Sequence, residues 1–251
     1  MKFTACTRPG QTRIDAGKQL PYTGTPLENT THRYFNLITA IFVTCLVTSN
    51  IIAVKIVDIG GIALPAAVVI FPISYIFGDI LTEVYGYARS RQVIWIGFAC
   101  NAFAVLAIWI GGRLPAAVFW NGQPAWERIL GYTPRLLAAS FAAYLVGEFL
   151  NSLVLAKMKI ATRGRWLWTR TIGSTLIGEG ADSMIFITAA FAGTIPWGNL
   201  AQLAVAQWLF KSAYEAAATP ATYAIVRFLK RKEGVDHYDT NTDFNPFILK
   251  G

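Results

Sequence analysis

Charged residues are scarce in this sequence. Asp, Glu, Lys and Arg make up 14% of its 251 residues, against about 25% in an average soluble domain, which excludes most soluble folds. Hydrophobic residues account for 54% and aromatic residues for 14%, and this excludes a disordered or fibrous chain. The length fits one or two soluble domains or a bundle of membrane-spanning helices with short loops. The composition favours the membrane bundle.

Cysteine and histidine are also rare. The three cysteines, Cys6, Cys45 and Cys100, are too few for a disulfide framework. The two histidines, His32 and His237, lie outside every long apolar stretch, so none is available within the membrane for a metal or a nucleophile relay. No glycine-rich loop followed by Lys and Ser or Thr is present, so we do not expect the chain to handle ATP. We expect no cofactor, no metal site and no enzymatic activity.

Long apolar stretches are the main feature of the chain. Each is about long enough to cross a hydrocarbon core of roughly 30 Å as a helix. They predict an all-α, polytopic membrane protein with six transmembrane helices, at residues 35–57, 63–84, 93–112, 136–156, 171–192 and 199–228. The last stretch contains Pro220, which predicts a tilt, a kink or a break.

The regions outside these stretches complete the predicted organisation. Residues 1–34 are polar and predict a flexible cytoplasmic arm. Residues 35–228 are expected to form the six-helix transmembrane domain, and residues 229–251 a cytoplasmic tail, which we expect to be solvated and partly disordered. The loop at residues 113–134 is interrupted by Pro and Gly. It predicts a short outer helix or a lid.

The distribution of Lys and Arg predicts the orientation, because these residues accumulate on the cytoplasmic side of a membrane. Most basic residues fall in the loops on the side shared by both termini, where the sequence has Arg33, Arg89, Arg91, Lys157, Lys159, Arg163, Arg165, Arg170, Lys230, Arg231 and Lys232. The opposite side has Arg113, Arg128 and Arg135. Both termini are therefore expected in the cytoplasm and the protein in the inner membrane. Topology accounts for the net charge of +8 without a direct nucleic-acid partner.

Acidic residues within the apolar stretches point to a functional interior. A charged residue at the centre of a span costs about 2.5 to 3.5 kcal/mol, so these side chains must face one another, water or a ligand. Six of the fourteen acids are in this position: Asp79, Glu83, Glu148, Glu179, Asp182 and Glu215. We infer a polar interior built by several helices, as in a transporter of a small polar molecule.

Spacing places these acids on shared helical faces. Glu83 follows Asp79 by four residues, Asp182 follows Glu179 by three, and Asn151 follows Glu148 by three, so each pair shares a face. In the last stretch Glu215 follows Lys211 by four residues, which predicts mutual neutralisation within that helix.

Structural roles for the same residues stay open at this stage. Asp79 and Glu83 are near the predicted cytoplasmic end, where interfacial water could hydrate them. Glu179 and Asp182 could hold helices together, and a buried Lys–Glu pair is often purely structural. The same choice between a neighbouring helix and a ligand applies to four amides, Asn50, Asn101, Gln202 and Gln207.

Four segments carry a resemblance to a known family. They read TSNIIAVKIVDIGG, FPISYIFGDILTEVYGYARSR, LWTRTIGSTLIGEGADSMIF and KSAYEAAATPATYAIVRFLK. This succession, over roughly residues 36–232, resembles the queuosine precursor transporter family, also called the vitamin uptake transporter or YhhQ type. The resemblance implies an inner-membrane carrier that imports a 7-deazaguanine precursor of the tRNA base queuosine: the 7-cyano compound, the 7-aminomethyl compound or queuine. Glu148 and Glu179 stand where it leads us to expect glutamine, which leaves the exact ligand and any proton coupling open.

The candidate residues fit the chemistry of such a ligand. A deazaguanine presents adjacent N–H donors that one carboxylate can accept, and its carbonyl needs a donor. Its planar ring needs a stacking surface, and an aromatic residue lies four positions from an acid in three places: Tyr75, Tyr144 and Phe186. We expect Glu179 or Asp182 to read the base. Asp79 and Glu83 are expected to shape the cytoplasmic half of the pathway.

Two broader questions stay open from the sequence. Asn50 followed by Lys55, and Asn151 followed by Lys157, occupy corresponding places in the first and fourth stretches, a short echo compatible with an inverted 3+3 repeat. The competing functions are a substrate-binding membrane subunit of an ATP-driven uptake complex, an intramembrane enzyme acting on a lipid, and a structural or sensory subunit. The expected partners are a small deazapurine and the lipid bilayer, and a homodimer is compatible with the sequence.

Overall fold

The computed structural model describes residues 33–59, 62–131, 134–194 and 196–248. All of them belong to one compact unit, His32–Gly251. The expected arm at residues 1–34 lies outside the described residues, apart from its last two positions.

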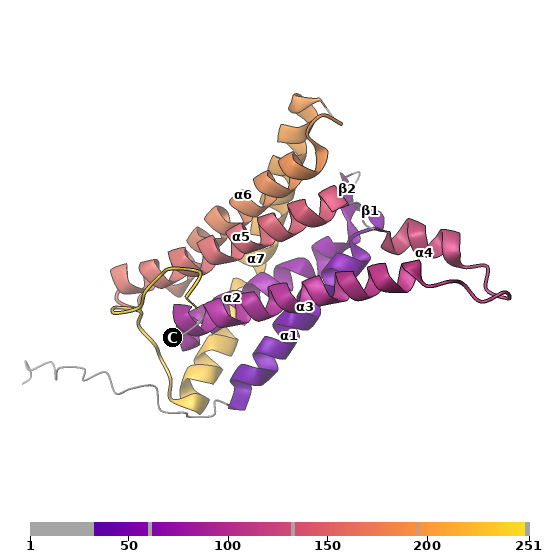
Figure 1. Ribbon diagram of the computed structural model, residues 1–251. Helices are drawn as coiled ribbons and strands as arrows, with labels where there is room; N and C mark the ends of the chain where they lie inside the picture. Colours follow the sequence, from indigo (N-terminus) through magenta and orange to yellow (C-terminus); the bar gives the residue numbers. More distant parts are fainter. Residues whose placement is uncertain (1–32, 60–61, 132–133, 195, 249–251) are drawn as a thin grey trace, which may run out of the picture. The chain divides into compact units, whose positions relative to one another are not determined.

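The described residues form a helical bundle with one small hairpin (Figure 1). Its elements follow in chain order: α1 (Arg33–Ile52), β1 (Ile56–Ile59), β2 (Ile62–Pro65), the 3₁₀ turn η1 (Ala66–Val69), α2 (Phe71–Tyr85), α3 (Tyr87–Arg113), α4 (Gln123–Leu130), α5 (Pro134–Ala161), α6 (Leu167–Phe191) and α7 (Trp197–Glu233). The predicted helical class is confirmed, and the short α4 lies within the loop predicted to form an outer helix or a lid.

Three stretches are long and apolar enough to cross a membrane in the part of the chain that the structure describes. They are Arg33–Ile52, Tyr87–Arg113 and Gln123–Ala161. The other long elements fall short because α2 has only 15 residues and because α6 and α7 carry charged side chains at mid-length. The count of six spans, the side of the termini and the inverted repeat stay predictions.

The second predicted span, residues 63–84, is wrong as a single helix. Its first part is strand β2 and the turn η1, and α2 starts only at Phe71. Strand β2 pairs antiparallel with β1, with Ile59 opposite Ile62 and Ile56 opposite Pro65. Continuous hydrophobicity concealed this hairpin, although β-branched residues around Gly60 and Gly61 are a hairpin signal in the sequence.

Helix α7 runs without a break through Pro220, from Trp197 to Glu233. A proline removes one helical hydrogen bond, but it does not end the helix here. Of the three predicted outcomes, the break is therefore excluded, and the tilt and the kink stay predictions.

The tail after α7 contacts the bundle at residues 234–248, so its expected disorder is wrong there, while many of its side chains are exposed, in line with the expected solvation. Asp239 is buried and accepts the backbone N–H of Tyr87, and Arg91 Nη1 donates to the Asp243 carbonyl at 2.8 Å. The Trp95 indole donates to the Pro246 carbonyl at 2.8 Å. These contacts at the start of α3 are tertiary, so local composition could not predict them.

Glycine brings α5 and α6 into close contact. A Cβ added at Gly178 would lie 2.7 Å from the Asn151 Cβ and 2.8 Å from the Gly147 carbonyl oxygen, closer than packed atoms allow. Small residues at such a crossing let two helix backbones approach in a membrane. The crossing places Glu148 and Glu179, each of which follows one of these glycines, in the same layer of the bundle.

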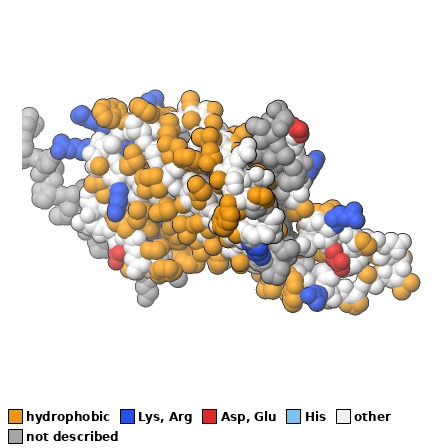
Figure 2. Space-filling model, turned by 90° about the horizontal axis from the view of Figure 1, so that it is seen from above, with side chains coloured by type: hydrophobic (Ala, Val, Ile, Leu, Met, Phe, Trp, Pro, Cys, Tyr) orange, Lys and Arg blue, Asp and Glu red, His pale blue; other side chains and the backbone are white. Residues whose placement is uncertain are grey.

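The outer surface is apolar, as expected for a protein surrounded by lipid. Phe103 and Trp109 of α3 are 72% and 58% exposed. Figure 2 shows hydrophobic side chains across the middle of one face, with Lys and Arg toward its ends. Many charged side chains are buried instead, and two of them, Asp182 and Lys211, line the candidate site.

Candidate functional site

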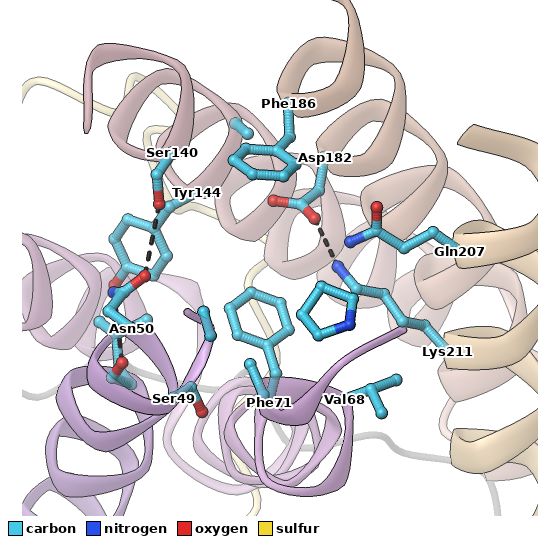
Figure 3. A pocket seen from close by; sticks show the side chains of 15 residues that line it. Ser49, Asn50, Val68, Phe71, Ser140, Tyr144, Asp182, Phe186, Gln207 and Lys211 are labelled. Carbon is cyan, nitrogen blue, oxygen red and sulfur yellow. Dashed lines mark hydrogen bonds and ion pairs between the residues drawn. The ribbon is translucent and has the colours of Figure 1, made fainter. Parts of the chain in front are cut away.

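A cavity lies between the helices near the hairpin (Figure 3). Side chains from five helices, η1 and the hairpin region line it: Leu46, Ser49, Asn50, Ala53, Pro65, Ala67, Val68, Phe71, Ser140, Ala143, Tyr144, Asp182, Phe186, Gln207 and Lys211. Its lining mixes apolar and aromatic groups with a few polar ones, as small-molecule sites do.

The polar groups of the cavity stand on two opposing walls (Figure 3). On one wall Ser140 Oγ donates to Asn50 Oδ1 at 3.4 Å. On the other, Lys211 Nζ donates to Asp182 Oδ2 at 2.6 Å, with Gln207 one turn before Lys211 on α7. A polar molecule held between the walls meets hydrogen-bonding groups at both of its edges.

Aromatic rings lie between these walls. Phe71, at the start of α2, and Phe186, on α6, both line the cavity (Figure 3). Lys211 Nζ lies 4.3 Å from the centre of the Phe71 ring, a cation–π contact. Tyr144 also lines the cavity, but its hydroxyl donates to the Ile94 carbonyl at 3.0 Å, which fixes the ring. The cavity therefore offers aromatic surfaces against which a flat ring can pack.

Beyond the cavity lining is a group of buried acids that we call the carboxyl core: Asp79 on α2, Glu148 on α5, Glu179 on α6 and Glu215 on α7. Each is at most 3% exposed. Asn151 Nδ2 donates to Asp79 Oδ1 at 2.7 Å. Gly78 leaves room for Glu148, because a Cβ there would lie 3.1 Å from Glu148 Oε2. The core places acidic groups from four helices in one layer.

The predicted pairing of Lys211 with Glu215 is wrong. Lys211 Nζ lies 2.6 Å from Asp182 Oδ2 and 2.9 Å from Glu179 Oε2, so its partners are the two acids of α6. A four-residue spacing puts two side chains on one helical face, but a long lysine can reach a neighbouring helix instead. Glu215 faces the Asp79 carboxyl.

Glu83 belongs to a separate cluster at the end of the bundle where α2 ends and α6 begins. Its carboxylate, 1% exposed, accepts from Arg170 Nη2 at 2.8 Å and from Lys230 Nζ at 2.7 Å. Lys159 Nζ donates to the Glu83 backbone carbonyl and to Asp236 Oδ1, both at 2.6 Å. We call these five residues the basic cluster.

Asp236 brings the tail into the basic cluster. Burial alone would raise its pKa, but hydrogen bonds from Lys159 and Lys230 outweigh burial and hold the pKa of this carboxyl below its ordinary value. The cluster ties α2, α5, α6, α7 and the tail together where Glu83 is buried.

The structure sorts the sequence-predicted residues into three groups. The first group lines the cavity and consists of Asn50, Tyr144, Asp182, Phe186 and Lys211. The second group is the carboxyl core with two neighbours, and its members are Tyr75, Asp79, Glu148, Asn151, Glu179 and Glu215. Glu83 is apart, in the basic cluster.

Sequence reasoning missed part of the site. Phe71 and Ser140 line the cavity but resemble ordinary residues of apolar helices. Phe71 precedes Tyr75 by four residues, and their ring centres are 5.5 Å apart, so the aromatic spacing is the signal that could have found it. Arg170 appeared only as a loop charge, although it is buried against Glu83.

The comparison with protein families matches residues 65–225 to the family described as "Putative vitamin uptake transporter". The matched range runs from the end of β2 into α7 and contains most of the cavity lining. The chain belongs to this family. The protein is thus a transporter, and its apolar helices make it a multi-pass membrane protein that handles a small molecule.

Three curated relatives are similar to the transporter. A protein of Bacillus subtilis (strain 168), named "Probable queuosine precursor transporter", is 29% identical over 191 residues, 74% of this chain and 82% of that protein. The "Queuosine precursor transporter" of Escherichia coli (strain K12) is 28% identical over 121 residues, 48% of this chain and 52% of that protein. A Haemophilus influenzae protein named "Probable queuosine precursor transporter" is 25% identical over 144 residues, 56% of this chain and 59% of that protein. No solved structure matches the chain.

Proposed function

We propose that the transporter imports a 7-deazaguanine precursor of queuosine across the inner membrane: the 7-cyano compound, the 7-aminomethyl compound or queuine. The names of the three relatives support this substrate class. The imported base serves tRNA modification, so the protein itself needs no contact with nucleic acid.

The cavity supports the proposal through its combination of rings and opposed polar walls. A deazaguanine is flat and carries adjacent N–H donors beside a carbonyl on one edge. Phe71 and Phe186 can cover its faces, since every base has a π-face on which an aromatic ring can stack. Asn50 and Gln207 supply amides that both donate and accept hydrogen bonds.

Asp182 is the best candidate to read the base. It lines the cavity, whereas Glu179, the other candidate, belongs to the carboxyl core. One carboxylate can accept two adjacent N–H donors. Lys211, held against Asp182 at 2.6 Å, is placed beside the same site to donate to the carbonyl of the base. This Asp182–Lys211 pair in an aromatic-lined cavity is the observation that carries the proposal.

The basic cluster supports the proposed orientation. Lys159, Arg170 and Lys230 pair with Glu83 or Asp236. Arg170 Nη1 also donates to the Arg165 carbonyl in the basic loop between α5 and α6, and basic loops mark the cytoplasmic side. The cavity, near the hairpin, then lies toward the outer side. In this orientation the basic cluster and the tail separate the cavity from the cytoplasm.

A cellular assay tests the function. Cells that can neither synthesise nor import the precursor receive this gene, and queuosine in their tRNA is measured by mass spectrometry. The medium is supplemented with 7-cyano-7-deazaguanine, 7-aminomethyl-7-deazaguanine or queuine, one at a time. At least one supplement should restore queuosine. Normal membrane levels of the protein with no restoration by any supplement would refute the function.

A further inference from the structure

Asp79 and Glu215 form a carboxyl pair that the proposed binding of a base leaves unexplained. Asp79 is 1% and Glu215 3% exposed, and their carboxyl groups lie within hydrogen-bonding reach of each other. Two ionised carboxylates in contact repel strongly, so such pairs hold a shared proton. Asn151 donates to Asp79 Oδ1, which leaves Asp79 Oδ2 without a donor among the described residues.

No nearby cation neutralises the negative charge of this carboxyl pair in the described part of the chain. The titratable groups in and around the pair come from four helices: Tyr75, Asp79 and Glu83 from α2, Glu148 from α5, Glu179 and Asp182 from α6, and Lys211 and Glu215 from α7. Lys211 forms ion pairs with Glu179 and Asp182, and the cations around Glu83 belong to the basic cluster. Asp79, Glu148 and Glu215 therefore have no basic partner of their own within the described ranges.

A second observation points to a small ligand in the same layer. The Tyr75 hydroxyl is fully buried among the carboxyl groups, yet it makes no hydrogen bond to any described residue. Both oxygens of Glu148, which is 0% exposed, are likewise unpaired in the described part of the chain. A buried donor and several buried acceptors without partners are costly. Binding and release of a proton would directly change the free-energy cost of burying these unpaired groups.

We propose that Asp79 and Glu215 bind the proton that drives import, with Glu148 and Tyr75 as part of the same proton site. This rests on the proposed function and adds its energy source. The pair binds one proton from the outer side when the cavity receives a neutral base. It releases that proton to the cytoplasm together with the base, so one positive charge enters in each cycle.

Proteoliposomes that contain the purified protein test the proposal, with 7-cyano-7-deazaguanine as the neutral probe. Exchange of labelled for unlabelled probe, without any gradient, first reports substrate handling. A gradient of one pH unit, acidic outside, is then imposed with the membrane potential clamped at zero. For one coupled proton it should sustain about tenfold accumulation of a neutral substrate. Exchange without accumulation would overturn the proton site, whereas absence of exchange with 7-cyano-7-deazaguanine, 7-aminomethyl-7-deazaguanine and queuine alike would instead refute the proposed substrate class.

A measurement on the unaltered protein keeps the test independent of folding defects. An inward gradient of the probe should acidify the lumen, as seen with a trapped pH-sensitive dye. Probe entry without acidification would overturn the proposal, and so would accumulation driven by a sodium gradient at constant pH.

Variants locate the site. Asp79→Asn and Glu215→Gln should each lower the accumulation driven by the pH gradient from about tenfold to about onefold, that is, to equal concentrations on both sides. The accumulation of each variant is expressed relative to its own exchange rate. Glu127→Gln is the matched control, because Glu127 is an exposed acid on α4, and its accumulation should match that of the unaltered protein. Full coupling in both core variants would contradict the assignment to this pair.

Discussion

Lys211 offers the sharpest test of the site's electrostatics. It is 4% exposed and holds two buried acids of α6, at 2.6 Å from Asp182 and 2.9 Å from Glu179. With an effective dielectric constant of about 20, each contact is worth about 6 kcal/mol of attraction before solvation costs. Removal of solvent from the ions offsets much of this, and loss of one partner from a buried ion pair costs roughly 3 to 5 kcal/mol net. Lys211→Ala should therefore strongly lower the thermal stability of the protein in detergent.

The pairing can be resolved with double variants. Lys211→Ala combined with Asp182→Asn removes one stranded charge and should recover part of the lost melting temperature. Lys211→Ala with Glu215→Gln is the matched control, because Glu215 does not pair with Lys211 and faces Asp79. Recovery in the Glu215 double variant that equals or exceeds recovery in the Asp182 double variant would refute the pairing. An unchanged melting temperature for Lys211→Ala alone would show that the three groups are not a buried cluster.

Four further predictions follow from the geometry. Phe186→Ala should weaken binding of 7-cyano-7-deazaguanine by about 1 to 3 kcal/mol, the value of one base–aromatic stack, in calorimetry; unchanged affinity would exclude stacking on this ring. Gly178→Ala should destabilise the protein by about 1 to 3 kcal/mol, because its Cβ would lie 2.7 Å from that of Asn151, whereas Gly198→Ala, with no atom within 4 Å, should not. The folded-state pKa of Asp236 is lowered, so the stability that this group contributes is fully present above its unfolded pKa of about 3.9 and is lost as pH falls through the lower folded value. Asp236→Asn should therefore have a lower melting temperature than the unaltered protein at pH 7. A difference in melting temperature that persists at the most acidic pH would contradict this ionic role. In a variant without native cysteines, cysteines at Val118 and Arg165, both exposed, should label from opposite sides of the membrane, and labelling from one side would refute the orientation.

Helix content and the acidic interior could be predicted from the sequence because both depend on local pattern. Apolar runs of about 20 residues favour helices, and α3, α5 and α6 overlap the predicted stretches closely. Acids within such runs had to face inward, and Glu148, Glu179 and Glu215 are buried. The cost of charge in an apolar medium sufficed for this inference.

Partners across the bundle could not be predicted in this way. Helical spacing shows which residues share a face, and it paired Lys211 with Glu215. The actual partners of Lys211 depend on how α6 packs beside α7. The docking of the tail on Tyr87 and Arg91 likewise joins segments about 150 residues apart. The hairpin before α2 was concealed because a continuous apolar run fits a strand as well as a helix.

Uptake by proteoliposomes that contain only this protein, without ATP, tests whether the chain alone carries a queuosine precursor. The compounds to compare are labelled 7-cyano-7-deazaguanine, 7-aminomethyl-7-deazaguanine and queuine. We expect that at least one compound enters, that excess unlabelled compound competes with it, and that Asp182→Asn reduces its entry. A subunit of an ATP-driven complex would give no uptake in this system. Failure of all three compounds to enter, with the protein folded and inserted, would contradict the proposed transport function.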